Sequence, residues 1–290
     1  GWTSFDVCAK MRSLLKTKKI GHAGTLDPLA TGILLVCIGN ATKLAERLQS
    51  HHKEYIAGVT FGATTPSYDL EKEIDRFFPH EHISEETVEA ALPAFIGEQD
   101  QIAPLFSAKS VDGVRAYELA RKLYGTMGRG DSSPSLPSHS SDSSTDIDAA
   151  AKELIRVSRI NITELELIRF DTVAKASSVD AGFENTPSHF VGPSPCGQGG
   201  STVFETTPTD AVSKTASASS RINVTDNSAL GLPRAVVRIA CSKGTYVRAF
   251  ARDLGEALGS GAHLDSLQRS RSGIFRVEDA LTVEQTLNLL

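Results

Sequence analysis

Two serine-rich stretches limit which parts of the chain can build a hydrophobic core. Residues 125–150 contain eight serines between Ser132 and Ser144, and residues 176–230 are similarly rich in Ser, Thr, Gly and Pro. Segments of this composition bury too little apolar surface to offset the entropy that is lost on ordering. We therefore predict two long disordered insertions within one domain that spans residues 1–290, with a little order allowed near the ends of the second.

The remaining segments mix helical and strand patterns without a regular βαβ rhythm. Apolar residues recur at helical spacing from Asp6 to Leu15, Ser84 to Pro93, Val114 to Tyr124 and Tyr246 to Leu258. Continuous or alternating apolar patterns predict strands at Gly32–Ile38, Tyr55–Phe61, Arg156–Phe170 and Ala235–Ser242. This mixture indicates an α+β fold rather than a doubly wound parallel sheet.

The sequence lacks the motifs that are typical of several functional classes. The four cysteines, Cys8, Cys37, Cys196 and Cys241, lie far apart and form no CxxC pair, which argues against a zinc site and a disulfide scaffold. The histidines form no HExxH arrangement. No apolar run approaches the roughly 18 residues that span a bilayer. We expect no bound metal and no membrane insertion.

The charge is unevenly distributed along the chain. The net charge is −5, yet residues 1–60 carry eight Lys and Arg against four Asp and Glu, and residues 233–276 carry eight against three. If the fold brings these two basic segments together, they can form a face that binds phosphates. Composition alone favours ordinary solvated surface charge.

The most unusual segment is GHAGTLDPLATG, residues 21–32. Its three glycines allow positive backbone φ angles and a close approach to a ligand. Pro28 disfavours the helical region at Asp27, so the carboxylate should stand on a stiff, extended turn. A carboxylate held in this way is a candidate nucleophile or base. An ordinary Asp-Pro turn is the alternative, and the residues by themselves favour it.

This loop and five further segments together resemble the TruB family of tRNA pseudouridine synthases. The further segments, in chain order, are GWTSFDV, KEYIAGVTFGATTPSYDLE, QIAPLFSAKSVDGVRAYELAR, CSKGTYVRAFARDLG and GAHLDSLQRSRSGIF. They cover most of residues 1–124 and 233–276. The resemblance implies a pseudouridine synthase fold, with a mixed, mostly antiparallel central sheet flanked by helices and loops.

The resemblance also implies a role for individual residues. Asp27 matches the catalytic carboxylate, and Arg248 matches the arginine that pairs with it. Tyr55 matches the tyrosine that stacks on the target base, and Tyr246 matches a second tyrosine of the pocket. Arg248 could otherwise be a surface arginine one turn from Arg252, and either tyrosine could simply belong to the core.

Other matches are less specific. His22 matches a loop histidine that enters the space left by the flipped base, although a histidine between glycines can be plain surface. Leu267 matches a pocket leucine within what reads as a mixed helix, where a leucine belongs to the core by default. Asp69 and Glu71 are assigned no catalytic role. The chain departs from the family pattern at Ala103, Ser110 and Gln268, which bears on RNA affinity more than on chemistry.

The activity implied by the resemblance is the isomerisation of uridine 55 in the T-loop of tRNA to pseudouridine. The nucleophile would be Asp27, the uridine would be flipped out of the T-arm, and no cofactor would be needed. Two other readings stay open: a guide-dependent, dyskerin-like rRNA pseudouridine synthase, and a non-catalytic tRNA-binding or folding chaperone. We see no RNA-binding PUA module after Arg276 and expect an intracellular monomer, with an organelle (plastid or mitochondrion) as one location.

Overall fold

The computed structural model describes residues 2–107, 109–111, 113–120, 155–172 and 224–288. The predicted insertion at 125–150 lies outside these ranges, as does the second insertion up to residue 223. Residues 224–230 form the end of that predicted second insertion, where the sequence allowed a little order. They include a short 3-10 helix, η3 (Ser228–Leu230), and the backbone N–H of Thr225 donates to the carbonyl of Leu70 at 3.0 Å.

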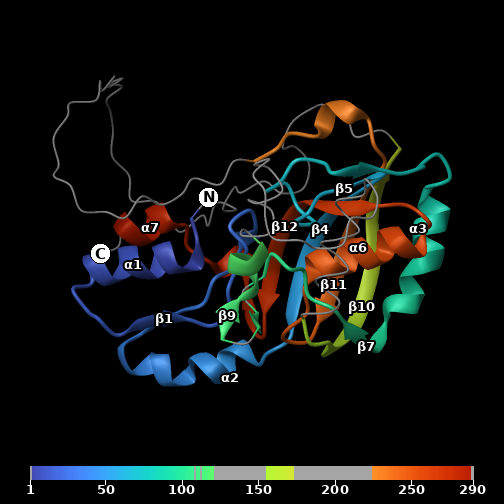
Figure 1. Ribbon diagram of the computed structural model, residues 1–290. Helices are drawn as coiled ribbons and strands as arrows, with labels where there is room; N and C mark the ends of the chain where they lie inside the picture. Colours follow the sequence, from blue (N-terminus) through green and yellow to red (C-terminus); the bar gives the residue numbers. More distant parts are fainter. Residues whose placement is uncertain (1, 108, 112, 121–154, 173–223, 289–290) are drawn as a thin grey trace, which may run out of the picture.

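A large sheet forms the centre of the described residues (Figure 1). Its strands lie in the order β13-β12-β4-β11-β10-β7, and β2 pairs with β12. The bounds are β2 (Thr31–Gly32), β4 (Lys53–Phe61), β7 (Gly97–Gln101), β10 (Ser158–Asp171), β11 (Arg234–Cys241), β12 (Ala262–Ser272) and β13 (Phe275–Arg276). Every pairing is antiparallel except that of β2 with β12. The predicted α+β fold with a mostly antiparallel sheet is confirmed.

Two helices pack on the core of this sheet. α6 (Val247–Ala257) packs against β12 and β4, and α3 (Glu85–Ala91) packs against β10; both bury apolar side chains in the central core. The rings of Phe95 and Phe250 meet edge to face, with centroids 5.5 Å apart. Ser84 caps α3 as predicted, accepting from the N–H of Thr87, and a 3-10 turn, η2 (Leu92–Phe95), follows where Pro93 ends the α-helix.

A second, smaller group of elements lies to one side of the sheet (Figure 1). It contains α1 (Ser4–Leu14), β1 (Ile20–His22), β3 (Val36–Ile38), η1 (Gly39–Leu44) and α2 (Ala45–Gln49). Cys8, Met11 and Ile20 form its buried centre. The segment between β1 and β3 carries Asp27 and returns to the central sheet as β2. The Asp27 loop therefore connects the two groups.

The predicted continuous strand at Gly32–Ile38 is wrong. The chain forms β2 on the central sheet and then β3, which pairs with β1 in a separate ribbon. Ile33 donates its N–H to the carbonyl of Arg269, while the carbonyl of Leu35 accepts from Ala23. The backbone groups of β2 and β3 are both hydrogen-bonded, but to different partner strands. An apolar run in the sequence does not specify which partner a strand takes.

Two further expectations need correction. The helix predicted from Val114 begins only at residue 116, because β9 (Val114–Arg115) first pairs with β8 (Ser110–Val111). The part of that helix beyond residue 120 lies outside the described residues. Leu267 lies on β12, not on a helix.

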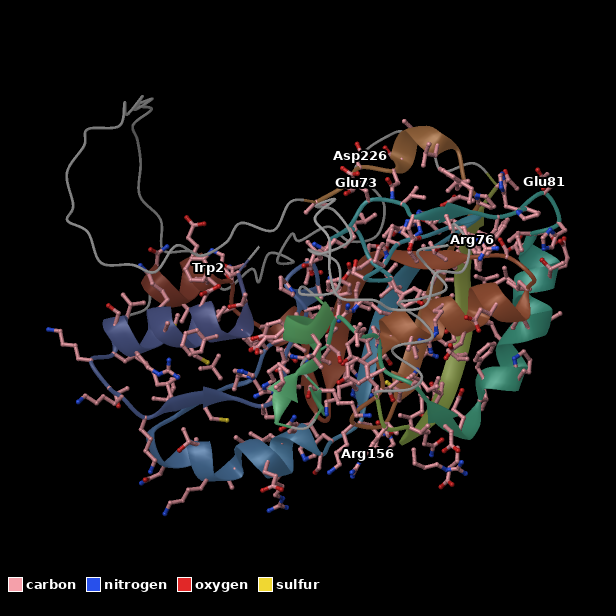
Figure 2. All side chains as sticks on the ribbon, viewed as in Figure 1. Trp2, Glu73, Arg76, Glu81, Arg156 and Asp226 are labelled. Carbon is pink, nitrogen blue, oxygen red and sulfur yellow. The ribbon has the colours of Figure 1, made fainter. Side chains whose placement is uncertain are left out.

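The remaining described elements are short. They are β5 (Ala63–Thr64), β6 (Arg76–Phe77), η4 (Val277–Asp279) and α7 (Val283–Asn288). Figure 2 shows Glu73 and Asp226 along one edge, where residues 224–226 run beside the β5–β6 connection. Within the described ranges, no helix combines the length and apolar character that crossing a bilayer requires.

Candidate active site

The Asp27 loop is a tight turn that is fixed at its base. The carbonyl of Asp27 accepts from the N–H of Ala30 at 2.9 Å, which places Pro28 at the second position of a β-turn. Gly24 and Gly32 both have φ of 97°. Gly21 has no positive φ, so the sequence-based expectation holds for two of the three glycines.

Helix α1 holds the loop immediately before the aspartate. The N–H of Leu26 donates to the hydroxyl of Ser4 at 2.9 Å, and that hydroxyl lies 3.3 Å from the Leu26 carbonyl. Ser4 itself is 4% exposed. Because Leu26 precedes Asp27 directly, this contact limits how far the carboxylate can move. A serine in the first turn of a helix gives no sequence signal for such a role.

Asp27 and Arg248 form a two-point ion pair, although they lie 221 residues apart in the chain. The Nε atom of Arg248 lies 2.9 Å from Oδ2 of Asp27, and Nη2 lies 3.3 Å from Oδ1. The side chain of Arg248 is 6% exposed, whereas that of Asp27 is 38% exposed. The guanidinium is therefore buried behind a carboxylate that remains open to a ligand.

Other groups hold Arg248 in place. It donates to the carbonyls of Ser67 and Phe106, each at 3.0 Å, and lies 3.7 Å from Oδ2 of Asp69. Burial alone would lower the pKa of Arg248, but the charges of Asp27 and Asp69 raise it above its usual value. Arg248 is thus a permanently charged, fixed cation, not the surface residue that the alternative reading allowed.

Asp69 is a site residue to which the sequence gave no role. Its Oδ1 atom accepts from the hydroxyl of Ser67 at 2.6 Å and from the N–H of Glu71 at 3.0 Å, while Oδ2 faces Arg248. The residue is 7% exposed. Arg248 therefore lies between two carboxylates, and Asp69 is the buried one.

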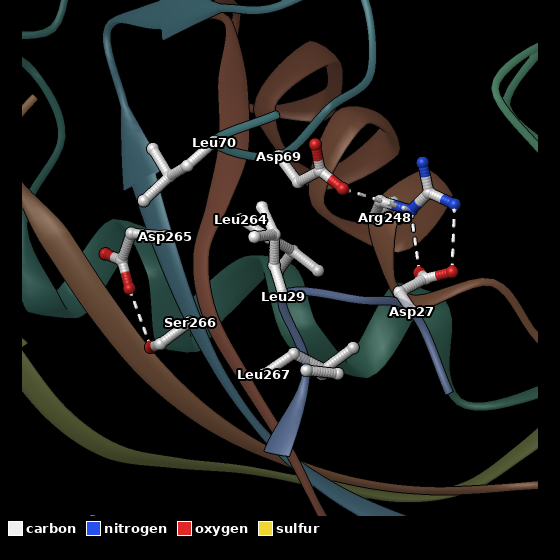
Figure 3. A pocket seen from close by; sticks show the side chains of 10 residues that line it. Asp27, Leu29, Asp69, Leu70, Arg248, Leu264, Asp265, Ser266 and Leu267 are labelled. Carbon is white, nitrogen blue, oxygen red and sulfur yellow. Dashed lines mark hydrogen bonds and ion pairs between the residues drawn. The ribbon is translucent and has the colours of Figure 1, made fainter. Parts of the chain in front are cut away.

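A pocket opens on the exposed side of this cluster (Figure 3). The space within it is about 280 Å³, including the part that is open to solvent, and it has a polar group at each end with leucines between them. It is lined by Asp27, Leu29, Ala30, Asp69, Leu70, Arg248, Leu264, Asp265, Ser266 and Leu267. The structure thus places the predicted residues Asp27, Arg248 and Leu267 around one cavity. A mostly apolar cleft with a few convergent polar groups is the usual form of a ligand site.

The far wall of the pocket is a second ion pair. Asp265 binds Arg234 through contacts of 2.5 Å to Nε and 2.8 Å to Nη2, and it accepts from the hydroxyl of Thr60 at 2.8 Å. Burial would raise the pKa of Asp265, but Arg234 and its other donors lower it below the usual value. A Cβ on Gly58 would lie 2.1 Å from Oδ1 of Asp265, so a larger residue there would displace this ion pair.

The two predicted tyrosines flank the pocket without lining it. Burial raises the pKa of Tyr55 to about 12, with the nearby Arg269 opposing and Asp27 adding to the increase. Burial also raises the pKa of Tyr246, and Asp27 again contributes. Both phenols therefore lie within range of the Asp27 charge and are neutral at physiological pH. Gln101, which the sequence did not single out, binds both the N–H and the carbonyl of Tyr246, at 2.9 and 3.2 Å.

His22 lies at the end of β1 and does not line the pocket. Burial lowers its pKa, and the charge of Arg269 lowers it further. Its Nδ1 atom is buried and has no hydrogen-bond partner among the described residues. The structure thus makes His22 a neutral, partly buried side chain. In the described part of the chain, no three His, Cys, Asp or Glu residues cluster closely enough to hold a metal ion.

Comparison with known proteins agrees with this geometry. The family described as TruB family pseudouridylate synthase (N terminal domain) matches residues 12–126, and the tRNA pseudouridylate synthase B C-terminal domain matches residues 248–290. A protein of Phocaeicola vulgatus named tRNA pseudouridine synthase B is 40% identical, over 98% of this chain and 86% of that protein. The chain belongs to the TruB family.

A further relative and a solved structure also resemble the chain over nearly its full length. A tRNA pseudouridine synthase B of Thermus thermophilus is 37% identical to this TruB chain, over 97% of it and 72% of that protein. A solved H/ACA RNP bound to a substrate RNA contains a chain that is 18% identical, with a TM-score of 0.51 over 99% of this chain. The TruB chain spans half the length of that chain, and the likeness confirms the fold alone.

These findings confirm the family and fold that the sequence motifs indicated. The structure adds most to the interpretation of Arg248, because the sequence allowed both a pocket and a surface position for this residue. The individual roles of His22, Tyr55, Tyr246 and Leu267 stay predictions, as does the division of residues 1–290 into a single domain with insertions.

Proposed function

We propose that this TruB chain isomerises uridine 55 in the T-loop of tRNA to pseudouridine, with Asp27 as the nucleophile. One observation carries the proposal above all. The Asp27 carboxylate is 38% exposed at the pocket, while the guanidinium that grips it is 6% exposed. Relatives that include the protein of Phocaeicola vulgatus are named tRNA pseudouridine synthase B, which supports tRNA as the substrate.

The reaction is an isomerisation and balances without another reagent. The bond between C1′ of the ribose and N1 of uracil breaks, the base turns, and C1′ rejoins it at C5. The hydrogen from C5 is lost and N1 gains one, so no net oxidation or reduction occurs. An oxygen of Asp27 can add to the base or to the ribose, and both routes need an ionised carboxylate beside the nucleotide.

Arg248 stays paired with that carboxylate while the substrate displaces water. Attraction between a fixed cation and a carboxylate strengthens as the pocket dries. The two-point contact at 2.9 and 3.3 Å also fixes the direction of the oxygens. The second carboxylate, Asp69, balances the charge of Arg248 when Asp27 becomes covalently bound.

The detached uracil needs a surface that holds it without reacting with it. In the proposed function, Tyr55 supplies an aromatic plane for stacking, and Leu267 and Leu29 supply apolar contacts. Tyr55 stays protonated because its pKa is about 12. Tyr246 closes the side nearest α6. Each of these groups restrains the base while its bond to the ribose is broken.

The target uridine has to leave the T-arm before it reaches Asp27. We propose that the protein recognises the bent shape of the T-arm, as is usual for structured RNA, and acts as a monomer without metal or cofactor. The neutral His22, at the end of β1, would occupy the space that the flipped base vacates.

The test uses purified protein and an unmodified tRNA transcript, with pseudouridine mapped chemically. Wild type should form product at the T-loop uridine, and Asp27→Asn should form none while binding the tRNA with similar affinity. Asp100→Asn is the matched control, because Asp100 is an exposed carboxylate paired with Arg159 on the sheet edge. It should behave as wild type.

Other outcomes of this experiment would support other functions. Equal product from Asp27→Asn and wild type would remove Asp27 from the chemistry. Binding without product from either protein would point to a tRNA chaperone. Product that appears only when a guide RNA is added would indicate a dyskerin-like enzyme.

A further inference from the structure

Arg269 is a buried cation to which the chemistry above gives no role. It lies on β12, two residues beyond Leu267, and is 1% exposed. Among the described residues, it forms no ion pair with a carboxylate. A buried charge is costly unless its donors are satisfied, so the groups that Arg269 binds indicate what it is for.

The guanidinium binds both arms of the Asp27 loop. Its Nε atom donates to the carbonyl of Ile33 at 2.8 Å. Its Nη1 and Nη2 atoms lie 3.4 Å from the carbonyls of Thr25 and Gly24. Residues 24–25 precede Asp27 and residue 33 follows it. One side chain therefore bridges the start and the end of the segment that presents the nucleophile.

The backbone of Arg269 adds to this contact. Its carbonyl accepts from the N–H of Ile33 at 3.0 Å, next to the point where β2 pairs with β12. A Cβ on Gly32 would lie 2.3 Å from that carbonyl, so the loop reaches Arg269 only because residue 32 is glycine. With φ of 97°, the same residue is also in a conformation that other residues rarely adopt.

Arg269 also lies beside the residues proposed to handle the base. Its charge opposes the burial that raises the pKa of Tyr55, and it helps to lower the pKa of His22. Tyr55 is its register partner on β4. Arg269 therefore contacts the nucleophile loop from the inside and adjoins the stacking tyrosine, while the exposed face of Asp27 stays free.

We propose that Arg269 is a positioning residue for pseudouridine formation, which closes the Asp27 loop from inside and so fixes the carboxylate between Arg248 and Tyr55. The inference rests on the proposed role of Asp27. It depends on the shape of the guanidinium as well as on its charge. A lysine keeps the charge, but its donors radiate from a single atom and cannot reach carbonyls on both arms.

The test compares Arg269→Lys with wild type and with Arg271→Lys. Arg271 lies on the same strand but is exposed, and among the described residues it donates to the carbonyl of Gly273 alone, so the same substitution there leaves the loop untouched. Two quantities are measured: the single-turnover rate of pseudouridine formation at saturating enzyme, and the dissociation constant for tRNA. Hydrogen exchange then follows the peptide that covers residues 23–33.

In Arg269→Lys, the single-turnover rate should fall by about 10²-fold, as expected for a misplaced reacting group, with tRNA affinity within about twofold of wild type. Exchange should accelerate in residues 23–33 and stay unchanged in β10 and β11. Arg271→Lys should match wild type in every measurement. Turnover near wild type in Arg269→Lys, or unchanged exchange in the loop, would overturn the proposal.

A second variant covers the case in which Arg269→Lys does not fold. Gly32→Ala keeps Arg269 but pushes the downstream arm away from it, and it should show the same loss of rate and the same faster exchange. Full activity in Gly32→Ala would also overturn the proposal. If wild type forms no pseudouridine, the proposed function fails, whereas the exchange experiment still decides whether Arg269 holds the loop.

Discussion

Single residues in this site work in charged groups whose members are far apart in the sequence. Arg248 lies between Asp27 and Asp69, and its remaining donors bind two backbone carbonyls. Both acids line the pocket, but the side chain of Asp27 is 38% exposed and that of Asp69 only 10%. The buried Asp69 therefore determines where the guanidinium sits when Asp27 changes its charge or its bonding.

Replacing Asp69 by asparagine should slow catalysis more than it weakens binding. The amide keeps the volume but removes the charge that holds Arg248, so the arginine would be left to Asp27 alone. We expect the single-turnover rate to fall by about 10- to 10²-fold, by misplacement of the reacting groups, with tRNA affinity nearly unchanged. Rapid-quench measurement at saturating enzyme checks this. An equal loss of rate in Asp75→Asn, whose acid binds Thr64 instead, would argue against a specific role.

His263 makes the stability of the fold depend on pH. It is fully buried, its Nδ1 lies 2.9 Å from the carbonyl of Ala63, and its Nε2 lies 3.4 Å from the amide nitrogen of Asn227. A carbonyl only accepts, so the neutral ring carries its proton on Nδ1. Burial lowers the pKa of His263 below the ordinary 6.5.

In the pH range between the folded pKa and 6.5, the unfolded chain binds a proton that the folded chain does not. The stabilisation is therefore present above pH 6.5 and is lost as pH falls through the folded pKa. Urea unfolding of wild type should show a lower free energy of unfolding at pH 5.5 than at pH 7.5, by at most about 1.4 kcal/mol per pH unit from this group. His263→Gln should show a smaller difference. An identical pH dependence in the variant would contradict the assignment.

At the scale of elements, the site depends on contacts between segments that are not neighbours in the chain. Helix α6 carries Arg248, but its N-cap residue, Tyr246, makes no side-chain capping bond. Gln101 at the end of β7 binds the Tyr246 backbone on both sides instead. Strand β7 therefore fixes where α6 begins, and with it the position of Arg248.

Gln101→Leu should displace the start of α6. The substitution leaves the part-buried N–H of Tyr246 without its partner, while the Tyr246 carbonyl keeps the N–H of Phe250 at 3.1 Å. We therefore expect a loss of about 1–3 kcal/mol in the free energy of unfolding. The turnover rate should fall as well, because Arg248 lies two residues into the helix. Gln99→Leu on the same strand also removes a backbone contact, to the carbonyl of Phe95, but leaves α6 alone. It should lower stability and spare the turnover rate, and the two variants are compared by urea unfolding and single-turnover assay.

At the scale of the whole molecule, the fold uses much of its positive charge internally. The two basic segments do lie side by side, since β4 pairs with both β11 and β12. Yet five arginines of the second segment are buried or bound to acids and carbonyls within the protein: Arg234, Arg238, Arg248, Arg252 and Arg269. Lys243, Arg271 and Arg276 stay exposed. The excess of basic residues in the sequence therefore overstates how many of them are free to bind phosphates.

Turnover should not depend on a divalent ion bound by the protein. The described residues contain no cluster suited to one, and the isomerisation needs no Lewis acid to balance. A T-arm stem–loop that folds in monovalent salt should be converted at the same rate with and without a chelator. Loss of activity in the chelator, restored by added metal, would contradict this expectation.

The sequence by itself indicated the family, the α+β class and the pairing of Asp27 with Arg248, because motifs and local periodicity can be read along the chain. It also predicted β4, β10, β11 and α6 closely, since each buries a regular apolar face. It misplaced Leu267 on a helix, read β2 and β3 as one strand, and gave no role to Asp69, Gln101 or Arg269. Asp69, Gln101 and Arg269 contact carbonyls and charged groups that only the tertiary structure brings within 4 Å of them. The spacing of residues along the chain does not predict such contacts.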